Sequence, residues 1–248
     1  MSPVMIVTGS SRGIGAATAR LAGEQGYTVA VNYARNADAA NAVVANIEAN
    51  GGTALPVQAD VSQEADVMRL FETVDEKLGT LSVLINNAGI LEKQMRLEDM
   101  TAERIERVLA ANVTGAFLCA REAVKRMSTK HGGKGGSIVN VSSMVAKRGG
   151  ANEYVDYAAS KGAIEAMTIG LAQEVAKEGI RVNAVRPGVI YTDIHASGGE
   201  PGRVDRVGPS TPMGRGGKPE EVAQAILWLA SDKASYSTGT FIDVSGGR

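Results

Sequence analysis

Two side chains in the second half of the chain carry the clearest chemistry in this sequence. Tyr157 and Lys161 are four positions apart, so on a helix the phenol and the ammonium share one face. A neighbouring ammonium favours the phenolate and brings a tyrosine pKa from about 10 toward neutrality. We therefore predict that Tyr157 gives or takes a hydroxyl proton, as the interconversion of an alcohol and a carbonyl requires.

A pair of serines, Ser142 and Ser143, lies just after a predicted strand and upstream of the tyrosine. A hydroxyl near the reacting oxygen can donate a hydrogen bond and stabilise a developing alkoxide. We assign this role to Ser143 and keep Ser142 as the alternative. The serines matter because a Tyr-x3-Lys pair alone arises easily by chance.

A glycine-rich segment, TGSSRGIG at residues 8–15, follows the first predicted strand and opens a helix. Glycines let the backbone approach a pyrophosphate, and the helix N-terminus offers free N–H groups and a positive dipole. The spacing is Gly-x3-Gly-x-Gly and differs from the usual Gly-x-Gly-x2-Gly fingerprint. The segment predicts a dinucleotide site formed by Gly9, Ser11, Arg12, Gly13, Ile14 and Gly15.

The second predicted strand bears on which dinucleotide is accepted. The usual fingerprint has an acidic residue there, which binds both ribose hydroxyls and disfavours a 2′-phosphate. This strand ends in Asn32, with Arg12 in the glycine segment and Arg35 just past the strand. Either guanidinium can bind a phosphate through paired hydrogen bonds. We therefore predict that NADP(H) is the preferred cofactor and that NAD(H) is a possible one.

Composition and charge exclude several classes of function. The 26 basic and 27 acidic residues give a net charge of −1, which provides no field for nucleic acid or an anionic membrane. The single cysteine, Cys119, cannot form an internal disulfide, and neither His131 nor His195 has a carboxylate or thiol at a metal-ligand spacing. The N-terminus lacks a signal-peptide pattern, and no apolar stretch reaches about 18 residues. We expect a cytoplasmic protein without a metal.

Short β-branched runs alternate with helical periods along the whole chain, a pattern typical of a parallel sheet with helices on both faces. The expected fold class is α/β, a single doubly wound Rossmann-type domain over residues 1–248 with a seven-stranded parallel sheet. One expected helix follows Ser62 as its N-cap, because apolar residues recur at helical spacing up to Leu78. The other expected helices are 13–25, 37–50, 101–127, 156–178 and 219–230, and the expected strands are 4–8, 28–32, 54–59, 83–86, 137–141, 181–185 and 240–244.

Residues 191–218 are rich in Gly, Pro and Ser and long for a connection in a compact domain. We predict that they form a lid over the substrate; the alternative is a plain solvated loop. Tyr154 is assigned at most to the substrate wall. The predicted lid also carries charged side chains that could bind a polar substrate such as a sugar or simply be solvated: Glu200, Arg203, Asp205 and Arg206.

These motifs make the chain resemble the short-chain dehydrogenase/reductase family over essentially its whole length. Within that family it is most similar to bacterial members named as glucose dehydrogenases or 3-oxoacyl-carrier-protein reductases. The matching landmarks, in the family's order, are TGxxxGxG at 8–15, Asp60-Val61, Asn86-Asn87-Ala88-Gly89, Asn112, Ser143, Tyr157-x3-Lys161 and Pro187-Gly188.

The resemblance implies further roles. Asp60 and Val61 would contact the adenine, Lys161 would bind the nicotinamide ribose as well as tune Tyr157, and Asn112 would anchor a water in a proton relay. The serine of relatives often lies thirteen residues before the tyrosine, whereas Ser143 lies fourteen before it. The residues implied to lie beneath the cofactor or beside its carboxamide are Asn86, Asn87, Ala88, Gly89, Pro187, Gly188, Val189, Ile190 and Thr192.

The function predicted from these residues is that of an NADP(H)-dependent oxidoreductase. It interconverts a carbonyl and a secondary alcohol of a small molecule by hydride transfer, with Tyr157 as general acid/base. Two alternatives stay open: a sensor that binds the cofactor without turnover, and a sugar dehydrogenase of the same fold that prefers NAD. Small residues in the helix at 156–178 allow close packing against the sheet or another subunit, and we expect a homotetramer.

Overall fold

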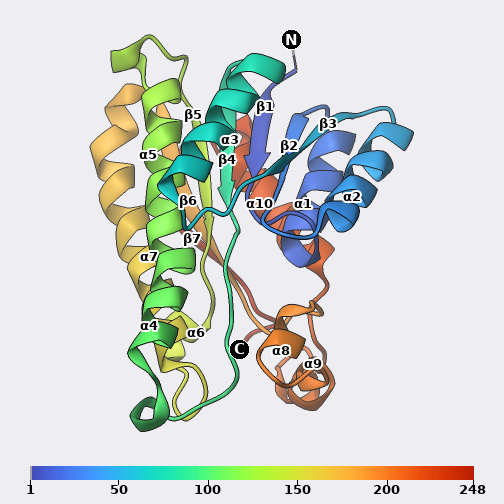
Figure 1. Cartoon of the computed structure of the whole chain (residues 1–248), viewed down its shortest axis with the longest axis vertical. Coiled ribbons are helices and arrows are strands. Elements are labelled where there is room, and N and C mark those ends of the chain that lie inside the picture. Colours follow the sequence, from blue (N-terminus) through green and yellow to red (C-terminus); the bar gives the residue numbers. More distant parts are fainter. Residues whose placement is uncertain (1) are drawn as a thin grey trace.

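The computed structural model describes residues 2–248, and in it seven parallel strands form one twisted sheet with helices on both faces (Figure 1). The expected fold class and strand number are confirmed. The strand order is β3-β2-β1-β4-β5-β6-β7. The strands are β1 (Val4–Val7), β2 (Thr28–Tyr33), β3 (Thr53–Gln58), β4 (Leu81–Asn86), β5 (Gly136–Val141), β6 (Ile180–Pro187) and β7 (Phe241–Val244).

The helices agree with the expected ones to within a few residues, apart from several short helices that the sequence did not indicate. One N-cap prediction is wrong: α3 begins at Glu64, and the Ser62 hydroxyl instead donates to Asp60 Oδ1 at 2.7 Å. The helices are α1 (Gly13–Glu24), α2 (Ala37–Ala49), α3 (Glu64–Lys77), α4 (Ala102–Leu109), α5 (Gly115–Met127), α6 (Val145–Arg148), α7 (Val155–Val175), α8 (Ile194–Ser197), α9 (Arg203–Val207) and α10 (Pro219–Ala230).

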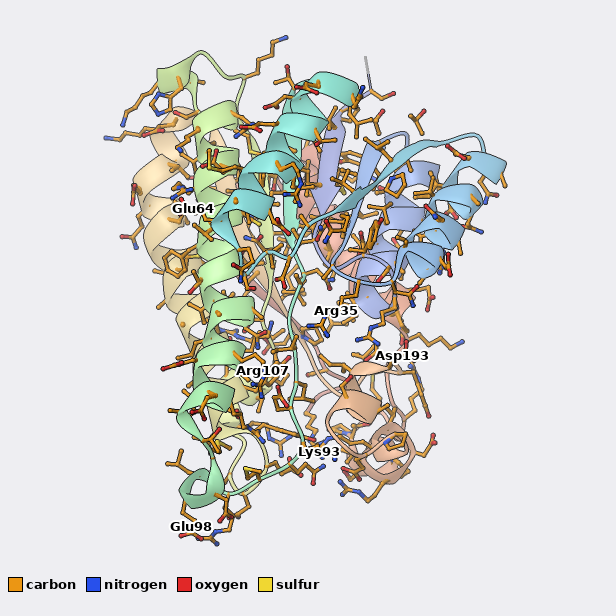
Figure 2. All side chains as sticks on the ribbon, viewed as in Figure 1. Arg35, Glu64, Lys93, Glu98, Arg107 and Asp193 are labelled. Carbon is orange, nitrogen blue, oxygen red and sulfur yellow. The ribbon has the colours of Figure 1, made fainter. Side chains whose placement is uncertain are left out.

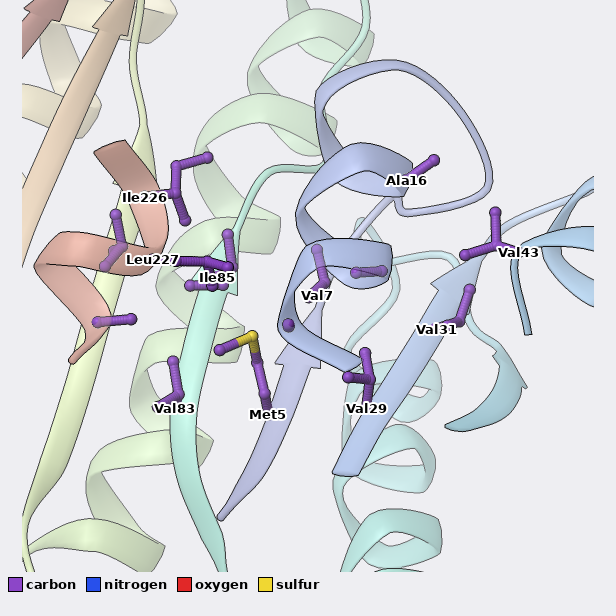
Figure 3. Packing of buried hydrophobic residues seen from close by; sticks show 14 of the residues in the cluster. Met5, Val7, Ala16, Val29, Val31, Val43, Val83, Ile85, Ile226 and Leu227 are labelled. Carbon is purple, nitrogen blue, oxygen red and sulfur yellow. The ribbon is translucent and has the colours of Figure 1, made fainter. Parts of the chain in front are cut away.

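The sheet separates two hydrophobic cores. On one face α1, α2 and α10 cover alternate strand residues such as Met5, Val29 and Ile85, none of which is exposed to solvent (Figure 3). On the other face α3, α5 and α7 pack over the intervening residues, including Ile6 and Leu84. Successive strand side chains point to opposite faces, so strands buried on both faces must be apolar throughout. This accounts for the continuous apolar runs in the sequence.

The chain reverses its direction of winding between β1 and β4, which are adjacent in the sheet. Successive strands are added outward from β1 to β3 on one side of the sheet and from β4 to β7 on the other. In open α/β sheets a crevice forms at such a switch point, beyond the carboxyl ends of the strands. The glycine segment after β1 and the Asn86–Gly89 segment after β4 therefore meet at one place.

The long helix expected at 101–127 contains a π-helical turn, residues 110–114, between α4 and α5. Such turns insert one extra residue into a helix and often occur at functional sites. Asn112 lies in the middle of this turn and is almost fully buried. Periodicity in the sequence did not indicate the turn, because a single π-turn hardly disturbs the apolar spacing of a long helix.

Residues 191–218 contain the short helices α8 and α9 and form a separate lobe below the sheet (Figure 1). The charged side chains there are mostly paired: Glu200 binds Arg203, Arg206 and Gln94, and Arg203 also binds Glu153. The segment is therefore a structured lobe with its own ion pairs. Its movement as a lid stays a prediction.

None of the helices described within residues 2–248 is long and apolar enough to cross a membrane.

Candidate active site

One cavity of about 1240 Å³ opens beyond the carboxyl ends of the strands. It runs from the glycine segment past β4 and β5 to α6, α8 and α9. Figure 2 shows the side chains of Arg35, Arg107 and Asp193 around its opening; they come from the turn after β2, from α4 and from the segment before α8. A cavity of this volume has room for a dinucleotide and a small substrate together.

The glycine segment is held in place by two asparagine side chains. Asn32 Oδ1 accepts from the Gly9 amide at 3.0 Å, while its Nδ2 donates to Val57 and Ala59 carbonyls. Asn87 Nδ2 donates to the carbonyls of Thr8 and Gly9 at 2.8 and 3.0 Å. The Asn32 amide is thus used within the protein, and the prediction that it contacts the cofactor is not tested by this geometry.

Glycine is required in this segment by close backbone approach. A Cβ on Gly15 would lie 2.4 Å from Asn87 Nδ2 and 2.6 Å from the Gly9 carbonyl oxygen. Gly9 and Gly13 have φ angles of +61° and +56°, which side-chain-bearing residues rarely adopt. Gly15 does not line the cavity. Because it has no side chain, the first turn of α1 can pack against Gly9 and Asn87.

Tyr157 and Lys161 lie in the middle of the cavity wall, in the first two turns of α7. Lys161 Nζ donates to the Val141 carbonyl at 2.8 Å and lies 5.5 Å from the centroid of the Tyr157 ring. This hydrogen bond holds the ammonium near the Tyr157 ring.

The pKa values of this pair differ from the expectation. Burial raises the pKa of Tyr157 to about 12, although interaction with the Ser143 hydroxyl lowers it, and burial lowers the pKa of Lys161 to about 8. The prediction that Lys161 brings the pKa of Tyr157 toward neutrality is not met here, because removal of the phenolate from water dominates. Tyr157 is therefore a protonated acid at neutral pH.

The structure separates the two serines. Ser142 is buried, and its hydroxyl donates to Glu165 Oε1 at 3.0 Å, away from the phenol. Ser143 interacts with the Tyr157 phenol and accepts a hydrogen bond from the Val145 amide at 3.2 Å. Ser143 is thus the serine beside the tyrosine.

A chain of polar contacts fixes the loop that carries Ser143. Glu165 binds both Ser142 and the Arg186 guanidinium, whose second partner is Asp243 on β7. Asp243 also binds Lys147 on α6 at 2.7 Å. The loop is thereby clamped on both sides of Ser143 by side chains from α7, β6 and β7, which limits the positions that its hydroxyl can occupy.

Asn112 lies behind the cavity wall. Its side chain forms a pair of hydrogen bonds with the backbone of Ile90, at 2.7 and 3.0 Å, and donates to Ser160 Oγ at 3.1 Å. A Cβ built on Gly89 would lie 3.3 Å from Asn112 Oδ1 and 3.6 Å from Lys161 Nζ. Asn112 and Lys161 therefore approach the same glycine, while the water relay itself stays a prediction.

Four of the predicted cofactor residues line the nucleotide end of the cavity. Asp60 and Val61 line the cavity after β3, and Asp60 is held by hydrogen bonds from the backbone and hydroxyl of Ser62. Arg12 and Arg35 line the same end, and neither forms an ion pair within residues 2–248. Both guanidiniums are thus available to a phosphate.

Most of the predicted residues line this cavity. Gly15, Asn86 and Asn112 are set back from it, and the charged lid residues Glu200, Asp205 and Arg206 do not line it. Sequence reasoning missed several residues at the substrate end because no spacing links them to a motif. Tyr154 and Arg203 are there, as a wall residue and a charged lid residue that the sequence had indicated, and the unexpected ones are Arg148, His195 and Arg248.

Comparison with known proteins agrees with this geometry. The family model described as enoyl-(acyl carrier protein) reductase matches residues 9–248. "Uncharacterized oxidoreductase YgfF" of Escherichia coli K12 is 61% identical over 245 residues, with 99% of each chain covered. The 3-oxoacyl-[acyl-carrier-protein] reductase of Synechocystis is 42% identical, and the match covers 98% of this chain and 96% of the Synechocystis chain.

Among solved structures, a short-chain dehydrogenase from Burkholderia cenocepacia in complex with NADP is similar with a TM-score of 0.90. It is 33% identical, with 99% of this chain and 97% of that chain covered. Fold, site and relatives define a nicotinamide-dependent oxidoreductase that acts on CH–OH donors. The chain belongs to the short-chain dehydrogenase/reductase family.

Proposed function

We propose that the enzyme reduces a carbonyl of a small molecule to a secondary alcohol, or catalyses the reverse reaction, with NADP(H). The observation that carries this proposal is the convergence of Ser143, Tyr157 and Lys161 on one wall of the cavity whose other end is the glycine segment. The spacing on α7 brings Tyr157 and Lys161 together, but only the fold brings Ser143, in the loop after β5, beside them.

In the proposed reaction NADP(H), when bound, supplies or accepts the hydride. Ser143 and Tyr157 donate hydrogen bonds to the carbonyl oxygen and hold it in the cavity. During reduction Tyr157 transfers its phenolic proton to the developing alkoxide, and in the reverse direction the phenolate takes it back. Lys161 binds the ribose and stabilises the phenolate left by proton transfer. A pKa of about 12 keeps Tyr157 protonated at neutral pH, which favours reduction.

The pH dependence of reduction follows from Lys161. Below a pH of about 8 its side chain is charged, and Tyr157 stays protonated over the whole working range because its pKa is about 12. We expect kcat/KM for NADPH to be level below pH 8 and to fall about tenfold per unit above it, as the ammonium is lost.

The pH profile is measured from pH 6 to 10 at fixed ionic strength. In Lys161→Arg any residual activity should no longer fall above pH 8, because arginine stays charged throughout that range. If kcat/KM of Lys161→Arg still falls above pH 8, a group other than Lys161 causes the fall.

Cofactor preference is proposed to come from Arg12 and Arg35, which would bind the 2′-phosphate. We expect Arg12→Ala/Arg35→Ala to raise the KM for NADPH about 10²–10⁴-fold and to change the KM for NADH little, since two hydrogen-bonded charges are lost and each contributes about 1.5–3 kcal/mol. Initial rates with both cofactors measure the ratio.

The matched control is Arg69→Ala/Arg121→Ala, which removes the same charge from side chains that are 51% and 42% exposed outside the cavity. The control should keep the wild-type ratio of NADPH to NADH. An unchanged ratio in the Arg12/Arg35 variant would show that the two arginines do not select the phosphate.

The proposed reaction is tested by following NADPH and NADH oxidation side by side with aldoses, diketones, β-ketoesters and aldehydes. Turnover of one class with NADPH supports the proposal and identifies the substrate type. Turnover confined to aldoses with NAD supports the sugar-dehydrogenase alternative. Tight NADPH binding without turnover of any compound supports the sensor alternative and contradicts the proposal.

Location and assembly are part of the proposal. A cytoplasmic enzyme is supported by the balanced charge and the single, buried Cys119. A homotetramer is supported by α7, whose small residues divide between two environments: Ala158 and Ala172 are buried, whereas a Cβ on Gly162 or Gly170 would meet no atom within 4 Å. Size-exclusion chromatography with light scattering tests the number of subunits.

A further inference from the structure

The cavity wall is positively charged although the chain has a net charge of −1. Seven basic and four acidic side chains line it. The acidic ones are Asp60, Glu92, Glu153 and Asp193, and the basic ones are Arg12, Arg35, Arg107, Arg148, Lys161, Arg203 and Arg248.

Most of these cations already have a partner or a role. Arg107 pairs with Glu92 at 2.8 Å, and Arg203 pairs with Glu153 at 2.6 Å. Under the proposed function, the two arginines of the nucleotide end and Lys161 serve the cofactor. Two cations are left over: among the ion pairs and side-chain hydrogen bonds of residues 2–248, none includes Arg148 or Arg248.

The two remaining arginines lie together at the substrate end. Arg148 ends α6, the short helix that follows Ser143, and the C-terminus lies between α6 and α8 (Figure 1). A hydrogen bond from the Met213 amide to the Gly246 carbonyl, at 3.1 Å, holds the C-terminal turn. Burial and then the nearby charges of Arg148 and Arg203 lower the pKa of Arg248. Clustered cations repel each other, so an anion placed among them would be stabilised.

Polar groups at the same end also lack partners. Tyr154 is only 4% exposed, burial raises its pKa, and its hydroxyl makes no hydrogen bond with the described residues. His195 Nε2 lies 2.9 Å from the Ile190 carbonyl, whereas the buried Nδ1 has no partner in residues 2–248. Unsatisfied buried polar groups are uncommon and fit an end of the cavity that takes a polar ligand.

We propose that Arg148 and Arg248 bind a carboxylate of the substrate, and that the substrate is an oxo acid. Its ketone would lie on Ser143 and Tyr157, and its carboxylate would reach the two guanidiniums, whose forked donors match a carboxylate in pairs. This assignment rests on the proposed function, since it takes the site of reduction as given. It deepens that function by naming the class of substrate.

The test uses pairs of compounds that differ only in charge. Oxo acids with the ketone two to five bonds from the carboxylate are compared with their methyl esters, with saturating NADPH. We expect the best acid to exceed its ester about 10- to 100-fold in kcat/KM, chiefly through KM. In Arg148→Gln/Arg248→Gln this ratio should fall to near one. The matched control Arg69→Gln/Arg121→Gln should keep the wild-type ratio.

Outcomes for the two proposals differ. Two results would overturn the oxo-acid assignment: equal rates for acid and ester in the wild type, or an acid preference that survives in Arg148→Gln/Arg248→Gln. In either case, turnover of the ester would still support carbonyl reduction. If no compound is turned over, binding of each pair to the NADPH complex of Tyr157→Phe decides the assignment. Tighter binding of the acid supports the oxo-acid assignment, and equal binding overturns it. The lack of turnover contradicts carbonyl reduction whichever binding result is found.

Discussion

Replacement of Tyr157 by phenylalanine is expected to reduce turnover by about 10²–10⁴-fold while NADPH binding stays within about twofold of the wild type. The variant removes only the hydroxyl that transfers the proton, and a positioned general acid contributes a rate factor of that size. Lys161 keeps its hydrogen bond to Val141, because that contact does not involve the phenol. The measurements are kcat for reduction and the Kd of NADPH from fluorescence.

The control is Tyr154→Phe, which removes the neighbouring buried hydroxyl three residues earlier. Its hydroxyl makes no hydrogen bond with the described residues, so no proton path runs through it in this structure. A large loss of kcat is expected only for Tyr157→Phe. Retention of wild-type kcat in Tyr157→Phe would remove this residue from proton transfer and leave the mechanism without its acid.

Replacement of Arg104 by methionine is expected to lower the free energy of unfolding by about 3–5 kcal/mol, because it leaves a buried carboxylate without its partner. Arg104 Nε donates to Asp156 Oδ2 at 2.8 Å, and the two side chains are only 7% and 2% exposed. Asp156 Oδ1 in turn accepts from the Tyr157 amide at 2.9 Å. The ion pair therefore fixes the start of α7, directly before Tyr157.

For a chain of this size each kcal/mol corresponds to about 2–4 °C, so the Tm of Arg104→Met should fall by roughly 6–20 °C. The control Arg69→Met breaks the ion pair between Asp66 and Arg69, whose side chain is 51% exposed. It should lower the free energy of unfolding by about 0–1 kcal/mol. A double variant, Arg104→Met/Asp156→Leu, should recover part of the loss, since it removes the unpaired charge. Equal Tm values for Arg104→Met and Arg69→Met would contradict this account.

Local spacing made the fold and much of the site predictable. Continuous apolar strands between amphipathic helices require a parallel sheet covered on both faces, and the structure has one. The glycine segment follows β1 directly, so its place beyond the strand ends could be predicted from neighbouring residues alone. Tyr157 and Lys161 share a helix face for the same reason.

Tertiary structure separated Ser143 from its alternative, Ser142. The family resemblance points to Ser143, but both serines follow β5 and the residues alone do not exclude Ser142. Glu165 on α7, held in place by Arg186 on β6, binds Ser142. Only Ser143 therefore lies beside the phenol. These contacts join residues more than 20 positions apart, a range over which the sequence pattern carries no register.

The sequence by itself determined the class of chemistry. It places a glycine segment for phosphates at the carboxyl end of a strand, and a phenol and an ammonium on one helix face. The direction in which the pKa of Tyr157 shifts and the charge at the substrate end were decided by the fold. Burial, which raises the pKa of Tyr157 to about 12, depends on every element packed around it. Likewise Arg148 and Arg248 are a hundred positions apart, and they share a cavity only because the C-terminal turn packs against residues 211–214.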